Sequence, residues 1–108
     1  MQKDGYVYLI GSVDDAKRFK IGVTRGDVNK RLKKLQTGNP EQLYVRHSFK
    51  THSPFKLEKM LHVIYANNKE LNEWFNVDGD DINNFIETCE KCQKNIDALK
   101  DNPFFKMN

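Results

Sequence analysis

Residues 5–24 contain two short runs from which the architecture can be inferred: Gly5-Tyr6-Val7-Tyr8-Leu9-Ile10 and Arg18-Phe19-Lys20-Ile21-Gly22-Val23-Thr24. In both runs apolar residues alternate with a phenol, an ammonium group or a glycine, which is typical of strands that bury one face. A loop rich in aspartate and lysine joins the runs, so we expect an antiparallel hairpin with strands at 6–10 and 19–23. Its exposed face would present Tyr8 and Lys20 together. A phenol beside cations favours phosphate binding over packing.

The next segment predicts a helix and a third strand. Asp27 is placed to cap the free amides of a helix at 28–36, along which Arg31 lies at the edge of an apolar stripe. Gly38 follows the helical pattern and suits a left-handed C-terminal cap. Alternation of apolar and polar residues then predicts a strand at 43–50.

A second helix is predicted to begin at Pro54, whose missing amide costs nothing at the first helical position. We expect Ser53 to cap this helix through its side chain. The expected buried stripe consists of Leu57, Leu61 and Ile64. Along its flank we expect Glu58, His62 and Tyr65.

The C-terminal part predicts a short strand at 73–77 and a helix over about 80–100. Apolar residues at alternating spacings of three and four form a continuous seam on this helix: Ile82, Phe85, Cys89, Cys92, Ile96 and Leu99. We expect the seam to pack on the chain's own sheet, although it could also pair with a second copy. A Cys-x-x-Cys pair can bind zinc or perform redox chemistry, but no second pair exists, so we interpret both cysteines as buried thiols.

The length of 108 residues predicts a single domain. Its core would span about 5–77, followed by the helix at about 80–100 and a short tail at 101–108. The expected fold class is α+β, with a small three-stranded, mostly antiparallel sheet flanked by helices. No apolar run approaches the roughly 20 residues that span a bilayer, and no signal-peptide core is present, so we expect an intracellular protein, cytoplasmic or nuclear.

The charge distribution is more informative than the net charge of +3. From Lys17 to Lys34 the chain has eight basic residues against a single acid, whereas residues 70–101 are mainly acidic. A cluster of lysines can be merely a solvated surface, but it can also bind a polyanion. The basic residues predicted to contact nucleic acid are Lys17, Arg18, Arg25, Lys30, Lys33 and Lys34.

Four motifs in this order resemble the GIY-YIG endonuclease superfamily over roughly residues 5–77. They are Tyr8 on the first strand, Ile21-Gly22 at the end of the second, Arg31 on the next helix and Glu58 on a later helix. Four features resemble more closely a branch found in phages, large DNA viruses and fungi, often described as a DNA-binding domain. These are Lys20-Ile21-Gly22 in the second motif, the run Leu35-Gln36-Thr37-Gly38-Asn39-Pro40, Glu58 with His62, and Glu73-Trp74-Phe75.

The chain departs from the superfamily pattern at three points. Tyr6 stands where the family name has glycine, and Lys20 replaces the tyrosine of the second motif. For the asparagine that supports the site late in the family pattern, Asn76 and Glu73 are both candidates.

The resemblance implies a divalent-metal-dependent DNA endonuclease with Tyr8, Lys20, Arg31 and Glu58 as catalytic residues. Glu58 would hold one Mg²⁺ or Mn²⁺ ion, and the Arg31 guanidinium would bind a phosphate oxygen bidentately. Lys20 would either stabilise Tyr8 as a phenolate base or bind phosphate itself and leave Tyr8 as a hydrogen-bond donor. Supporting roles are expected for Tyr6, Gly22, His62, Glu73 and Asn76; His62 would orient Glu58 or a water, or be purely structural.

Two other functions remain open at this point. The chain could be a DNA-binding module that keeps the fold and basic face without turnover, or a protein-interaction domain that assembles through its last helix. In each reading we expect no contact with a membrane, and we favour a monomer.

Overall fold

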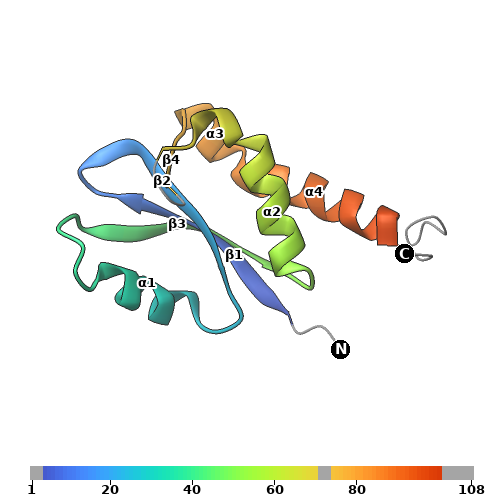
Figure 1. The fold of residues 1–108 in the computed structure, drawn as a ribbon, viewed down its shortest axis with the longest axis horizontal. Helices are drawn as coiled ribbons and strands as arrows, with labels where there is room; N and C mark the ends of the chain where they lie inside the picture. The colour runs from blue at the N-terminus through green and yellow to red at the C-terminus, as the bar shows by residue number, and fades with distance from the viewer. Residues whose placement is uncertain (1–3, 71–73, 101–108) are drawn as a thin grey trace.

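The computed structural model describes residues 4–70 and 74–100, which form one antiparallel sheet with helices on both faces (Figure 1). The strands are β1 (Gly5–Ser12), β2 (Asp15–Thr24), β3 (Leu43–Thr51) and β4 (Trp74–Asn76), in the spatial order β3-β1-β2-β4. The predicted hairpin and third strand are therefore confirmed, and the α+β class with them. The sheet has four strands rather than three, because the short strand predicted at 73–77 pairs with the outer edge of β2.

The alternation of side chains along β1 divides the core into two layers. Val7 and Leu9 point to one face, where they pack with Leu57 and Leu61 of helix α2 (Pro54–Ile64) and with residues of α4 (Phe85–Lys100). Tyr8 and Ile10 point to the other face, which helix α1 (Val28–Gln36) covers through Val28, Leu32 and Leu35. Figure 1 shows this arrangement, with α1 on one side of the sheet and α2 and α4 on the other. The phenol of Tyr8 thus lies in the smaller of the two layers.

The ends of α1 follow the predicted local chemistry. The carboxylate of Asp27 accepts a hydrogen bond from the backbone N–H of Asn29 at 2.7 Å, which satisfies one of the free amides of the first turn. Gly38 adopts a left-handed φ of 78° just after the helix. The side chain of Gln36 then bonds the loop to the helix, donating to the carbonyl of Glu41 at 2.8 Å and accepting from the N–H of Leu43 at 2.8 Å.

Two predictions about α2 are wrong. Ser53 makes no side-chain capping hydrogen bond, although Pro54 does occupy the first turn. Instead the hydroxyl of Thr51 accepts a hydrogen bond from the Ser53 N–H at 2.9 Å, so the loop is anchored from the end of β3. At the other end, Ile64 is 50% exposed and Tyr65 only 6% exposed. The reason is that α2 ends at Ile64 and the chain turns into the 3₁₀ helix η1 (Ala66–Asn68), which directs Tyr65 into the core.

The predicted helix at about 80–100 is two helices, α3 (Gly79–Asn83) and α4. Asn84, a weak helix former, separates them with a ψ of 6°, outside the helical range. The apolar seam packs on the chain's own core through Ile82, Phe85 and Ile96, as expected, whereas Leu99 is exposed. No helix among the described residues has both the length and the apolar character that a membrane crossing requires.

Candidate active site

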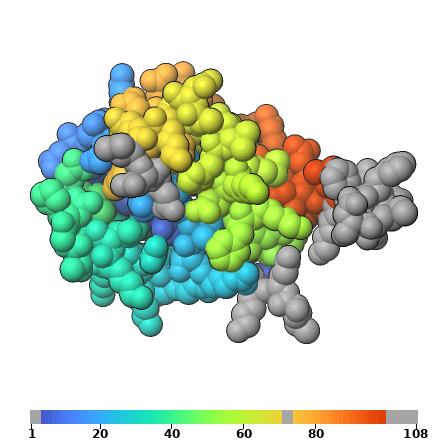
Figure 2. Space-filling model, in the orientation of Figure 1, coloured from blue at the N-terminus to red at the C-terminus, as the bar shows by residue number. Residues whose placement is uncertain are grey.

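Three of the four predicted catalytic side chains line one pocket. Tyr8 from β1, Arg31 from α1 and Glu58 from α2 surround a cavity of about 420 Å³, together with Val23, Thr24, Arg25 and Phe55. Figure 2 shows the end of β2 and the following turn at the surface between α1 and α2. Residues far apart in the sequence therefore meet beside the open end of the first hairpin.

Gly22 determines where the ring of Tyr8 lies. The two residues are register partners on adjacent strands, and the phenol ring crosses directly over Gly22. A Cβ atom at Gly22 would lie 2.6 Å from Cζ of Tyr8, closer than real Cβ contacts come. The glycine of the Ile-Gly motif thus has no side chain, and this leaves room for the buried aromatic ring.

Arg31 contacts the phenol of Tyr8. Its Nε donates a long hydrogen bond of 3.4 Å to the Tyr8 hydroxyl oxygen. Arg31 lies in the first turns of α1, where its own backbone N–H bonds to the carbonyl of Asp27, so the capped helix start fixes its position. The residue is exposed while Tyr8 is 1% exposed, so the guanidinium lies between the buried phenol and solvent.

Glu58 reaches the pocket although α2 covers the opposite face of the sheet. Strand β4 pairs only with residues 18–20 of β2, so no described strand extends the sheet beside the end of β2. His62, one turn after Glu58, donates from Nε2 to the carbonyl oxygen of Ile21 at 3.2 Å, and its ring packs edge-on against Phe75. This contact holds α2 beside the edge of β2, where Glu58 can reach around the strand. This contact is a structural one, and the predicted role of His62 in orienting Glu58 or a water stays a prediction.

The chemistry of the pocket suits a hard divalent cation better than zinc. Glu58 is half-buried and lines an open cavity, and Mg²⁺ or Mn²⁺ is commonly held by one or two carboxylates plus waters and substrate phosphate. No group of three His, Cys, Asp or Glu side chains that could hold a metal occurs in the described part of the chain. A closed protein cage of the structural zinc type is therefore not formed by these residues.

Lys20 lies on the same face of the sheet as Tyr8 but toward β4. Its Nζ is 5.8 Å from the centroid of the Trp74 ring, and Lys20 is not one of the seven described residues that line the pocket. The pairing of Lys20 with the phenol stays a prediction, whereas the contact of Arg31 with the phenol is observed.

Arg18, predicted to contact nucleic acid, interacts with groups of the protein itself. Its guanidinium lies 2.7 Å from a carboxylate oxygen of Glu41 and 3.8 Å from one of Glu70. It also stacks over Trp74 at 4.4 Å. With two carboxylates and an aromatic ring around it, Arg18 joins β2 to the loop after α1 and contributes little net positive charge to the surface.

The other predicted DNA contacts are exposed and distributed over two elements. Lys30, Lys33 and Lys34 lie on the exposed side of α1. Lys33 and Lys34 are in its last turn, where cations also stabilise the helix dipole. Arg25 lines the pocket, and Lys17 is exposed at the far end of β2.

Tyr6 and Asn76, two further residues predicted to support the site, are not among the described residues that line the pocket. Tyr6 is half-buried and pairs in register with Thr24 and Lys50. Asn76 is exposed on β4 opposite Arg18. Glu73, the other candidate for the late supporting position, lies outside the described residues, as does the tail at 101–108.

Three pocket residues were missed by the sequence analysis: Val23, Thr24 and Phe55. Thr24 lies two positions after Gly22 and therefore on the same face of β2, a spacing that could have identified it. Phe55 precedes Glu58 by three residues and so shares its face of α2. Thr24 and Phe55 could therefore have been identified from the strand period of β2 and the helical period of α2, because each shares a face with a site residue that was already predicted.

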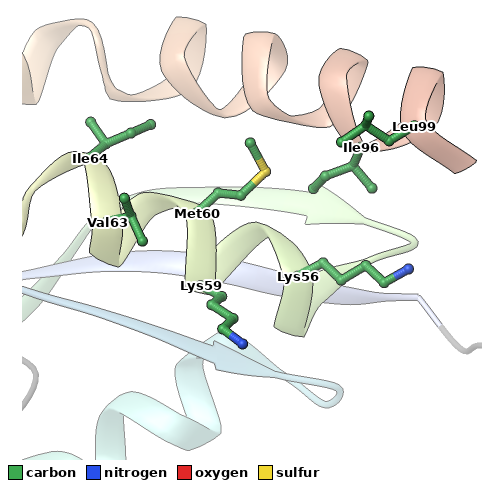
Figure 3. A pocket seen from close by; sticks show the side chains of 7 residues that line it. All are labelled: Lys56, Lys59, Met60, Val63, Ile64, Ile96 and Leu99. Carbon is green, nitrogen blue, oxygen red and sulfur yellow. The ribbon is translucent and has the colours of Figure 1, made fainter. Parts of the chain in front are cut away.

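A larger cavity, of about 860 Å³, lies in a groove between α2 and α4 (Figure 3). Its walls are apolar, and two lysines border them; the lining residues are Lys56, Lys59, Met60, Val63, Ile64, Ile96 and Leu99. Figure 3 shows the Met60 side chain pointing from α2 toward α4. Since the described residues of its lining include no carboxylate, phenol or imidazole, this groove offers fewer groups for acid–base or metal chemistry than the pocket around Tyr8.

The two cysteines are buried thiols, as interpreted from the sequence. Both are free and buried in the core beneath α4. Burial raises the pKa of Cys89 to about 12, with smaller contributions from Cys92 and Glu90, and burial also raises the pKa of Cys92. The neutral thiol is a weak nucleophile, so these groups suit packing and not redox chemistry.

Comparison with known protein families gives a match over most of the chain. Among models of protein families, that of the T5orf172 domain matches residues 5–92, from the first residue of β1 into α4. No curated protein and no solved structure matches the chain significantly.

Proposed function

The chain belongs to the T5orf172 domain family, a phage-associated and nuclease-related family, and we propose on this premise that it is a DNA endonuclease domain of the GIY-YIG type. The reaction would be the hydrolysis of a phosphodiester bond with the help of one divalent metal ion. One observation carries the proposal: a phenol, a guanidinium and a carboxylate from β1, α1 and α2 line a single pocket.

The side chains can be assigned roles from their positions. Arg31 lies at the boundary between the pocket and solvent, where its guanidinium can bind the phosphoryl oxygens of an incoming strand and stabilise the charge that develops on them. Its Nε also lies 3.4 Å from the Tyr8 hydroxyl. A positive charge there stabilises negative charge on the phenol oxygen, the form in which Tyr8 removes a proton from the attacking water.

Glu58 is the residue that would hold the metal ion. When bound, Mg²⁺ or Mn²⁺ supplies Lewis-acid stabilisation of the phosphoryl and leaving oxygens. Gly22 and His62 act as positioning residues: Gly22 leaves room for the Tyr8 ring, and His62 ties α2 to β2 next to Glu58.

The nicking of supercoiled plasmid by pure protein in Mn²⁺ tests this proposal. Glu58→Gln removes the carboxylate charge with little change of shape and is expected to abolish nicking. Glu87→Gln on α4 is the matched control, because Glu87 is an exposed carboxylate whose oxygen lies 3.6 Å from Nζ of Lys91 in the next turn. Absence of nicking by the wild type on supercoiled, linear and single-stranded DNA would contradict the endonuclease assignment, as would full activity of Glu58→Gln.

A DNA-binding module without turnover is the second candidate. It is supported by the basic exposed side of α1, which carries Lys30, Lys33 and Lys34 and no acid in its first turn. Binding would then weaken steeply as salt rises, because each phosphate contact releases counterions. Salt-dependent binding without nicking by the wild type is the outcome that favours this candidate.

A further inference from the structure

An exposed phenylalanine lies at the mouth of the candidate active site. Phe55 is 55% exposed, yet it lines the same pocket as Tyr8, Arg31 and Glu58. Trp74 and Phe75, the aromatic side chains of β4, are by contrast buried in the core. Burial does not explain Phe55, since more than half of its surface remains in contact with water.

The position of the ring is supported from two sides. Phe55 lies in the first turn of α2, directly after Pro54, which is buried and fixes the start of the helix. The guanidinium carbon of Arg25 lies 5.1 Å from the ring centroid, a cation–π contact. The loop that carries Arg25 is itself stabilised by a hydrogen bond from the Gly26 N–H to the Thr24 hydroxyl oxygen at 3.1 Å. An exposed ring held in this way is prepared to bind a flat ligand without first losing much conformational freedom.

A nucleic acid offers two groups that match this arrangement. The phosphate matches Arg31 and Arg25, and the face of a base matches an aromatic ring, with which it stacks regardless of sequence. In paired duplex DNA, however, the faces of each base are covered by its neighbours, so a ring can reach them only after unstacking. Only an unpaired nucleotide presents a base face without that cost.

We propose that Phe55 is a stacking platform for the unpaired base of a nucleotide next to the reacting phosphate. The preferred substrate class is then DNA with unpaired nucleotides, such as single strands, mismatched segments or frayed ends, in place of fully paired duplex. The inference rests on the proposed function, because it takes the pocket to be the place where DNA binds.

Binding without metal separates this inference from cleavage. Fluorescence anisotropy in EDTA compares a fully paired oligonucleotide duplex with the same duplex carrying three central mismatches and with its single strand. The wild type is expected to bind the two unpaired substrates about tenfold more tightly than the paired duplex, a size within the range that stacking of one base contributes. Phe55→Ala and Phe55→Leu are expected to lose that preference, whereas Phe55→Trp keeps it.

Two controls accompany these variants. Val63→Ala removes another exposed apolar side chain of α2, one that lines the groove toward α4, and is expected to change nothing. Phe55→Leu keeps an apolar side chain of similar size without an aromatic face, so its loss of preference reports stacking and not misfolding. A 2-aminopurine placed in the mismatched segment is expected to change its fluorescence with the wild type and not with Phe55→Leu.

The outcomes are distinguishable from those of the nicking assay. Equal affinity of the wild type for paired and unpaired DNA overturns the inference, even if the protein nicks plasmid. An equal loss on both substrates in Phe55→Leu also overturns it, since the side chain would then act only as an apolar contact. A preference that disappears in Phe55→Leu supports it, including in a protein that binds DNA without cleaving it.

Discussion

Replacement of Gly22 by alanine tests how the site is built. A Cβ atom would lie 2.6 Å from Tyr8 Cζ, about 0.9 Å closer than the roughly 3.5 Å at which carbon atoms normally approach. Alanine in a strand is ordinarily more favourable than glycine by about 0.5–1 kcal/mol. Forcing an extra methyl group into a packed site costs about 1–3 kcal/mol, so we expect a net destabilisation of about 1–2 kcal/mol.

The same displacement affects the proposed activity more than the stability. The phenol oxygen must move relative to Arg31 and Glu58, and a misplacement of about 1 Å can cost about a hundredfold in rate. Urea unfolding and plasmid nicking in Mn²⁺ measure the two effects. Gly79→Ala is the control, because no atom lies within 4 Å of the Cβ it would add.

A double-mutant cycle with Tyr8→Ala identifies the cause of the effect. Once the ring is removed, alanine at Gly22 is expected to be neutral or stabilising, because the clash is gone. If Gly22→Ala stabilises the wild-type protein, or costs the same with and without the Tyr8 ring, the steric reasoning is refuted.

Three further predictions concern charge, thiols and pH. Arg18→Ala is expected to lower the free energy of unfolding by about 1 kcal/mol and to leave the salt dependence of DNA binding unchanged. Lys33→Ala should instead reduce the slope of log K for DNA binding against log salt by about one. Equal slopes in the two variants would contradict this prediction. Burial raises the pKa of Cys89 from 9.0 to about 12, so Cys89 should resist iodoacetamide at pH 8 until urea unfolds the protein. The stability that the neutral thiol contributes should be lost as the pH rises above 9.0, because the thiol of the unfolded chain then ionises first. Rapid labelling of the native protein would argue against the burial of Cys89. Burial, together with the charge of Arg46, lowers the pKa of His47 below 6.5. The unfolded state therefore takes up a proton first, and the free energy of unfolding should fall as the pH decreases through 6.5. Urea unfolding at pH 7 and at pH 5.5 should show a smaller decrease of this free energy in His47→Gln than in the wild type.

The local features of the fold were predictable because each depends on a few neighbouring residues. Alternation predicted the hairpin and β3, and the carboxylate of Asp27 and the left-handed Gly38 predicted both ends of α1. The errors occur where the chain changes direction. Ile64 matched the helical period of α2 and was predicted to be buried, but the helix ends at this residue. Tyr65 is buried in its place, because the chain turns into η1 and the Tyr65 ring joins the core with residues of α4.

The candidate site was predictable only as a set of residues. Their types and order indicated phosphate chemistry, but the contact of Arg31 with the Tyr8 phenol and that of Lys20 with Trp74 could not be predicted. The ion pairs of Arg18 with Glu41 and Glu70 could not be predicted, because both partners are distant from it in the sequence.

The order of residues alone determined the strands, the caps and the apolar stripes, because alternation, helical period and capping act within a few positions. Tertiary structure alone decided which groups meet. Glu58 joins Tyr8 because β4 pairs with only part of β2, and His62 holds α2 beside the remaining edge. Such a meeting depends on the packing of whole elements across the sheet, which no short window of sequence encodes.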